Sequence, residues 1–155
     1  MDDLIGGLLT NGMLPPRLRE VVIMRVGWCT GSIYEWSRHW HVAVSVGLAP
    51  DEISDIRDWQ VSDRFNEIER ALLAATDEAL ATDRISDQNW QRCKEALGDD
   101  QLMMELVGVI GNWRMVALML NSLQIALEDS DAPWPPDGAD PRAEQTTLSP
   151  ASRAQ

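Results

Sequence analysis

The stretch that decides the fold runs from Pro15 to Gly47 and reads PPRLREVVIMRVGWCTGSIYEWSRHWHVAVSVG. Its apolar residues recur at helical spacing on both sides of Thr30-Gly31, a pair that suits a turn. Pro16 suits the first turn of a helix, because proline lacks the backbone N–H that this position leaves unpaired. We therefore predict a hairpin of two helices, Pro16 to Cys29 and Ser32 to Val46.

The second helix of this hairpin carries two ionisable side chains on its apolar side. On a helical wheel its polar arc is formed by five residues: Tyr34, Ser37, Arg38, His41 and Ser45. Glu35 and His39 lie outside that arc, and because they are four residues apart, their side chains are neighbours on one face. A carboxylate and an imidazole in an apolar environment are costly unless they are paired or used in chemistry.

The first helix has almost no polar face, which is typical of a helix buried on all sides. Glu20 lies on it beside Ile23, Met24 and Gly27 and adds a second carboxylate with apolar neighbours. Structural ion pairs would explain these charges without catalysis: Glu20 with Arg17 or Arg25, and Glu35 with His39 or Arg38.

The hairpin resembles a motif of the carboxymuconolactone decarboxylase and alkylhydroperoxidase-like superfamily. In the peroxidase branch, a Glu is followed twelve positions later by Cys-x-x-Cys, and a His stands four residues after the second Cys. Glu20, Ser32, Glu35 and His39 occupy these positions with every spacing kept, so both cysteines are replaced. The similarity continues through ALLAATDEAL, ISDQNW and WRMVALMLNSLQIALED and spans residues 14 to 129.

The resemblance implies an all-α, alkylhydroperoxidase-like helical bundle built around the helical hairpin. The residues agree, because the remaining apolar runs have the length and period of helices and no strand is indicated. We predict six or seven helices in total. Beyond the hairpin, they are a short helix after Pro50, a helix capped by Ser62, a helix capped by Ser86, and a long apolar helix from Gln101 to Leu127.

Two parts of the chain differ in composition. Residues 1–130 are predicted to form a single all-α domain, since 155 residues with 45% hydrophobic content suit one core. Residues 131–155 hold five of the eight prolines, mostly within DAPWPPDGADP, followed by small polar residues. Such a segment buries too little apolar surface to fold alone, so we predict a Pro-rich, partly disordered tail.

The charge and the apolar runs limit the partners. A net charge of -12 argues against nucleic acid and against an anionic membrane, since both favour a basic surface. The longest uncharged run, Met115 to Leu127, has 13 residues, fewer than the roughly 18 that a membrane span needs. The start, MDDLIGGLL, lacks the basic region of a signal peptide. A cytoplasmic location without membrane contact is therefore expected.

Cofactor motifs are absent from the sequence. His39 and His41 are two residues apart and point to opposite sides of their helix, so they cannot share a metal ion. There is no Gly-rich phosphate loop and no nucleotide fingerprint. We therefore expect chemistry without metal or cofactor.

The resemblance also implies roles for individual residues. Decarboxylases of this superfamily act on small carboxylated lactones without a cofactor and deliver a proton to carbon after carbon dioxide leaves; isomerisations and cyclisations of keto acids would use similar groups. His39 would be the proton donor, with Glu35 or Glu20 holding its tautomer, and Arg25 or Arg38 would hold the substrate carboxylate. The expected substrate-binding residues are Tyr34, Ser32 and Trp113.

Two alternatives remain open. The first is a non-catalytic oligomeric binding protein on the same scaffold, consistent with the lost cysteines. The second is an alkylhydroperoxidase-like peroxide reductase, which is disfavoured because it needs a thiolate and a resolving thiol. Cys29 is the sole thiol near the turn and has no resolving partner in sequence. Members of the superfamily form homotrimers or homohexamers, so the resemblance implies an oligomer with a small-molecule substrate.

Overall fold

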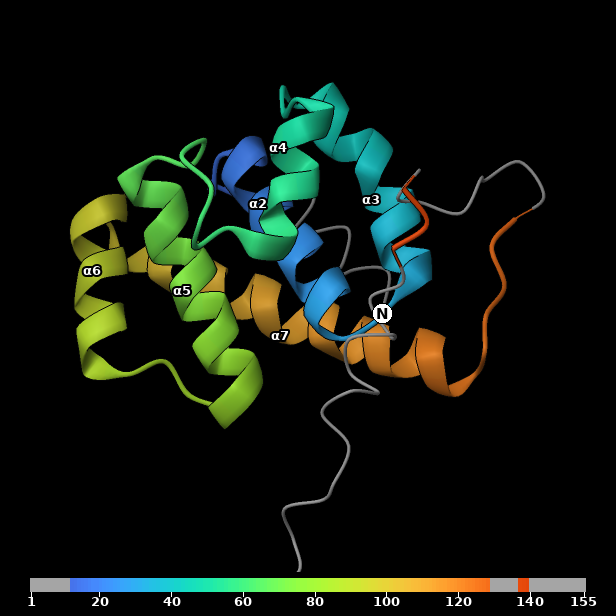
Figure 1. Cartoon of the computed structure of the whole chain (residues 1–155). Helices are drawn as coiled ribbons and strands as arrows, with labels where there is room; N and C mark the ends of the chain where they lie inside the picture. The colour runs from blue at the N-terminus through green and yellow to red at the C-terminus, as the bar shows by residue number, and fades with distance from the viewer. Residues whose placement is uncertain (1–11, 129–136, 140–155) are drawn as a thin grey trace, which may run out of the picture.

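The computed structural model describes residues 12–128 and 137–139, and within them every regular element is helical. This confirms the predicted all-α class. The elements are α2 (Pro16–Cys29), α3 (Ile33–Ser45), α4 (Pro50–Asp55), the 3₁₀ turn η1 (Ile56–Asp58), α5 (Glu67–Thr82), α6 (Asp87–Leu97) and α7 (Asp100–Ser122). In Figure 1, α7 runs along the base of the molecule, with α5 and α6 over its first half and α3 near its second half.

Helix α2 is the centre of the fold. It packs against α3, α5 and α7 at once and separates two clusters of buried side chains. Val22, Ile23 and Val26 face the cluster shared with α5, α6 and α7. Met24 and Trp28 face the cluster shared with α3, α4 and η1. A helix between two cores needs apolar residues on nearly all sides, which explains the missing polar face.

The hairpin forms for local reasons. Pro16 is the first residue of α2, and Gly31 takes a φ of 66°, a left-handed conformation that glycine adopts without strain. Ser32 then caps α3, and its hydroxyl accepts a hydrogen bond from the backbone N–H of Glu35. A Cβ on Gly27 would lie 3.4 Å from the Trp36 nitrogen and 3.5 Å from Glu35 Cβ, so the two helices approach most closely there.

Two of the three arginines of α2 are paired with acidic residues on neighbouring helices. Arg17 donates to Glu69 of α5 at 2.8 Å and to Glu52 of α4 at 2.7 Å. Arg25 forms an ion pair with Asp77 of α5 at 2.5 Å. The suggested pairs of Glu20 with Arg17 or Arg25 are therefore wrong, because both arginines bind partners across the helix interfaces.

Two predicted helix boundaries are also wrong. The helix after η1 begins at Glu67, capped by Asn66 in a reciprocal capping box with Glu69, whereas the Ser62 hydroxyl donates to Asp55. The last helix ends at Ser122 and not at Leu127. Gln124, with a φ of 52°, turns the chain there, and the N–H of Ile125 bonds back to the carbonyl of Leu120.

Helix α7 is apolar all round, but only one side of it is covered. Its buried residues face α2 and α5, while the outer side leaves apolar side chains in solvent: Met104, Val107, Met115, Leu118 and Met119. By length and composition α7 could also cross a membrane, although 39% of its most apolar window is packed inside the fold as in a core helix. The prediction that it is buried therefore holds for one side within the single chain.

A short piece of the predicted tail touches the helical domain. Arg57 of η1 donates to Asp137 at 2.8 Å, and Ala139 packs on the cluster around Trp28 and Trp36. The rest of the 131–155 tail, Trp134 included, lies outside the described residues, so its predicted disorder stays a prediction.

Candidate functional site

A small cavity between α3 and α7 collects most of the predicted site residues. Its volume is about 240 Å³, and seven residues line it: Tyr34, Glu35, Arg38, His39, Trp113, Val116 and Leu120. Four of these, Tyr34, Glu35, His39 and Trp113, were predicted from the sequence. The cavity is therefore our candidate active site.

The imidazole of His39 joins α3 to α2. Its Nδ1 atom lies 2.7 Å from Oε2 of Glu20, a carboxylate that is fully buried. The second oxygen of Glu20, Oε1, lies 3.7 Å from Nε of Arg19. Of the two carboxylates proposed to hold the His39 tautomer, Glu20 is thus the one in contact, and it lies behind the ring rather than in the cavity.

Trp113 of α7 contacts the other side of the same imidazole. Its indole N–H donates to Nε2 of His39 at 3.0 Å, and the two rings meet edge to face at 78°. Glu20, His39 and Trp113 therefore form one hydrogen-bonded chain across α2, α3 and α7. Sequence spacing could not reveal this chain, because its three members lie on three different helices.

Glu35 is buried but has no hydrogen-bond partner for its carboxyl group. Glu35 is 3% exposed, and neither of its carboxyl oxygens accepts a hydrogen bond from the described residues. Burial raises the pKa of Glu35 to about 8, and the nearby Ser32 hydroxyl counteracts this only in part. The raised pKa favours the neutral carboxyl near pH 7, in a residue that lines the cavity. The suggested pairs of Glu35 with His39 or Arg38 do not form.

Ser32 does not line the cavity. Its side chain is fully buried, and its hydroxyl caps α3 through the Glu35 N–H at 3.4 Å. It reaches the site only by positioning the first turn of α3. The prediction that it contacts substrate therefore has no support from its position.

The two candidate arginines lie in different places. Arg38 lines the cavity and is about half exposed, with Glu128 at 3.8 Å. Arg25 instead donates to Asp77 and to the backbone carbonyls of Ile56 and Arg57, in contact with η1. Of the two arginines, only Arg38 lines the cavity. Val116 and Leu120, which were not predicted as site residues, complete the apolar wall.

A second, larger hollow borders the cavity. Its volume is about 460 Å³, and its lining runs from the turn at Thr30 and Gly31 to the end of α7 at Asn121 and Gln124. Tyr34 and Leu120 line both spaces. Tyr34 therefore stands at the boundary between the two.

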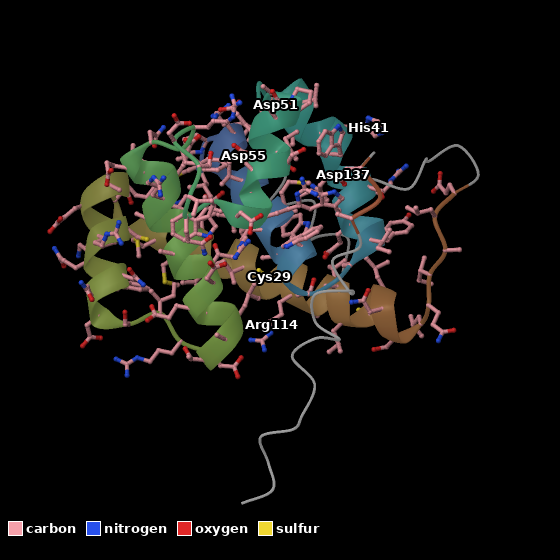
Figure 2. The ribbon with its side chains drawn as sticks, viewed as in Figure 1. Cys29, His41, Asp51, Asp55, Arg114 and Asp137 are labelled. Atoms are coloured by element: carbon pink, nitrogen blue, oxygen red, sulfur yellow. The ribbon has the colours of Figure 1, made fainter. Side chains whose placement is uncertain are left out.

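Cys29 and His41 lie outside the site. Figure 2 shows His41 near the end of α3 and Cys29 at the end of α2, and His41 is exposed to solvent. Burial raises the pKa of the Cys29 thiol to about 11, and the Asp77 carboxylate, 3.7 Å from its Sγ, adds to this, although Arg25 acts in the opposite direction. Cys29 is therefore a thiol at neutral pH, not a thiolate.

The side chains of the cavity define its chemistry. It offers one neutral carboxyl, one imidazole fixed on both sides, one guanidinium and an apolar wall. Among residues 12–128 and 137–139, no three His, Cys, Asp or Glu side chains gather as a metal site requires.

Solved structures with the same fold support the architecture. A protein of unknown function from Agrobacterium tumefaciens, suggested to be the antioxidant defence protein AhpD, superposes with a TM-score of 0.75 at 18% identity, covering 81% of this chain and 86% of its own. A variant of the debrominase Bmp8, bound to 2,3,4-tribromopyrrole, gives a TM-score of 0.70 at 18% identity over 94% of this chain and 73% of its own. At this identity the similarity concerns the fold alone.

The sequence itself carries the family relationship. No curated protein sequence matches the chain. The sequence profile of the carboxymuconolactone decarboxylase family, however, matches residues 1–78, half of the chain, including Glu20, Glu35 and His39. The chain therefore belongs to the carboxymuconolactone decarboxylase family.

Proposed function

We propose that this protein is a cofactor-free acid/base enzyme that acts on a small carboxylated lactone or keto acid. The observation that carries the proposal is the Glu35 carboxyl, buried without a hydrogen-bond partner on the wall of a cavity that also holds Arg38. A buried polar group without a partner is destabilising, and such groups gather at functional sites. A substrate oxygen or carbon can receive the proton that Glu35 holds.

Decarboxylation is the reaction that best uses these groups. Arg38 binds the carboxylate of the substrate at the edge of the cavity. The bond from this carboxylate to its neighbouring carbon breaks, carbon dioxide leaves, and the bonding electrons move into the conjugated carbonyl of the lactone or keto acid. The resulting carbanion takes one proton from the enzyme, and the enzyme recovers it from water. Isomerisation or cyclisation of the same substrates would need the same proton donor.

The test is a screen of carboxylated lactones and keto acids for carbon dioxide release. We expect wild-type protein to convert at least one of them, and Glu35→Gln to lower kcat about 100-fold or more, a typical contribution of a general acid. Glu67→Gln is the matched control, because Glu67 is exposed at the start of α5. If wild type only binds these compounds and converts none, the alternative of a non-catalytic binding protein replaces this proposal.

The peroxide-reductase alternative has little support from the thiols. Cys29 is neutral at pH 7 and Cys93 is fully buried, and neither lines the candidate active site. Treatment with peroxide followed by mass measurement tests this directly. Oxidation of Cys29 to a sulfenic acid at low peroxide would favour the reductase over the acid/base enzyme.

We also propose that the protein works as a homo-oligomer of trimer or hexamer type, with the outer side of α7 covered by a second copy. Four exposed apolar residues are placed symmetrically about Gly111 in the sequence. Met104 and Leu118 lie seven positions from it on either side, and Val107 and Met115 lie four positions from it. Two antiparallel copies of α7 would therefore bring apolar residues together around a two-fold axis, a contact that a hexamer contains.

Sedimentation measurements test this assembly. We expect wild type to sediment as an oligomer and Leu118→Glu to sediment as a smaller species. Val61→Glu is the control, because Val61 is 88% exposed and lies in the loop before α5. A monomeric wild type would end the proposal of self-association.

A further inference from the structure

Both ring nitrogens of His39 are occupied by fixed neighbours. Glu20 lies at Nδ1 and Trp113 at Nε2, at 2.7 Å and 3.0 Å. The ring is mostly buried, with 15% of its side chain exposed. The two contacts together decide where the proton of the imidazole lies.

The chemistry of the neighbours permits one arrangement. An indole N–H can donate but cannot accept, so Nε2 must present its lone pair and carry no hydrogen. Nδ1 must then carry the hydrogen and donate it to the Glu20 carboxylate, because a ring without either hydrogen would be an anion. An imidazolium would place two N–H groups against each other at Trp113. The neutral Nδ1–H tautomer alone satisfies both contacts.

Charged groups face the ring from α2 and α3. On α2, Glu20 has Arg19 within 3.7 Å, so a guanidinium is already present to balance its carboxylate. On α3, Glu35 and Arg38 line the same cavity, and Tyr34 borders it. On α7, Trp113 brings no charge.

We propose that Trp113 is a positioning residue whose indole N–H fixes His39 as the neutral Nδ1–H tautomer, so that Glu35, and not His39, gives the proton to the substrate. The part concerning the proton donor rests on the proposed function, and the tautomer does not. His39 is then not the proton donor that the resemblance implied. It links α2, α3 and α7 and holds Trp113 against the cavity, and it is a second positioning residue.

The proton balance follows from this assignment. Glu35 enters the cycle as a neutral carboxyl and loses its proton to the substrate carbanion as carbon dioxide departs. It is then a carboxylate next to Arg38 on the cavity wall, and water returns the proton after product leaves. His39 keeps its single hydrogen on Nδ1 throughout, between the ring and Glu20.

Nitrogen-15 NMR of the imidazoles tests the tautomer without any substrate. The chain has two histidines, so His41→Gln leaves a single ring to observe. We expect this ring to show a protonated Nδ1 and an unprotonated Nε2 at pH 7. A protonated Nε2, or a mixture of tautomers as in a free histidine, would overturn the proposal whether or not the variant is active.

Trp113→Phe, made in the His41→Gln background, tests the cause. It keeps an aromatic ring on α7 but removes the N–H. Because Glu20 still accepts from Nδ1, we expect Nε2 to gain a proton, so that the ring becomes an imidazolium. Trp90→Phe is the control, because Trp90 is 37% exposed on α6 and lies away from His39. An unchanged tautomer in Trp113→Phe would show that the indole does not hold it. If that variant fails to fold, the spectrum of the His41→Gln protein still decides.

The proton donor has its own readout. Infrared difference spectra between wild type and Glu35→Gln should show the carbonyl band of a neutral carboxylic acid at pH 7, which disappears in the variant. Absence of that band would overturn the assignment of Glu35 as donor. If the band and the tautomer are present but no lactone or keto acid is converted, the proposed reaction is wrong and the hydrogen-bond arrangement stands.

Discussion

Helices α2 and α7 look alike in sequence and differ in environment. Both are apolar on nearly every side, yet α2 has ten of its fourteen residues buried and α7 has seven of twenty-three. The helices of the same chain surround α2, whereas α7 is covered on its inner side only. An all-round apolar pattern therefore shows that a helix needs covering, but not which molecule covers it.

The ionisable side chains of α2 also differ from Glu35 of α3 in whether they have a partner. Every ionisable residue of α2 has a charged or hydrogen-bonding neighbour, through Arg17, Arg25 and Glu20 among them. Where the hairpin faces α7, Glu35 remains without one. Glu35 thus differs from the ionisable residues of α2 in having no partner for its carboxyl group, and it lines the candidate cavity.

The largest expected difference between the two helices concerns stability. Ile23→Ala on α2 removes a fully buried side chain and should lower the free energy of unfolding by about 2–5 kcal/mol. Leu118→Ala on α7, where the side chain is 67% exposed, should change it by less than about 0.5 kcal/mol in the monomer. Urea denaturation at low protein concentration measures both. Equal losses would mean that the outer side of α7 belongs to the folded core.

Two glycines give a smaller contrast. Gly27 faces the α3 backbone, so Gly27→Val should cost about 1–3 kcal/mol through overpacking. A Cβ on Gly111 meets nothing within 4 Å, so Gly111→Ala should stabilise the monomer by about 0.5–1 kcal/mol through its higher helix propensity. Thermal and urea unfolding of both variants check this. A destabilising Gly111→Ala that depends on protein concentration would indicate a subunit packed against α7.

The unpaired carboxyl of Glu35 should make stability depend on pH. The pKa of Glu35 is higher in the folded chain than in the unfolded chain, so the folded state binds the extra proton between these two values. Stability from this group is full at low pH and is lost as pH rises toward about 8. Between pH 6 and pH 7, wild type should lose about 1.4 kcal/mol relative to Glu35→Gln. Parallel curves for the two proteins would contradict the raised pKa.

The hairpin could be predicted because its signals are local. Pro16, Gly31 and Ser32 each act through their own backbone position, and the two helices follow from them. Glu35 and His39 were placed on one face by the helical repeat, and both line the cavity. The start of α5 was misplaced, since Ser62 and Asn66 are both good capping residues and tertiary contacts choose between them.

What the sequence could not provide are the contacts between helices. Spacing rules pair residues within one helix, so they predicted Arg17 or Arg25 as the partner of Glu20. The actual neighbour is His39 of another helix. The same limit hid the donor at Nε2 of His39, since Trp113 is distant in the chain. It also left Arg25 and Arg38 equivalent, until the fold placed one at η1 and the other at the cavity.

The position of Tyr34 has a consequence for how large a substrate the protein admits. Tyr34 and Leu120 line both a space of about 240 Å³ and a neighbouring one of about 460 Å³. Shortening the Tyr34 side chain would merge the two compartments without altering the acid, the guanidinium or the imidazole. Under the proposed function, such a substitution would change the length of substrate admitted and leave Glu35, Arg38 and His39 in place.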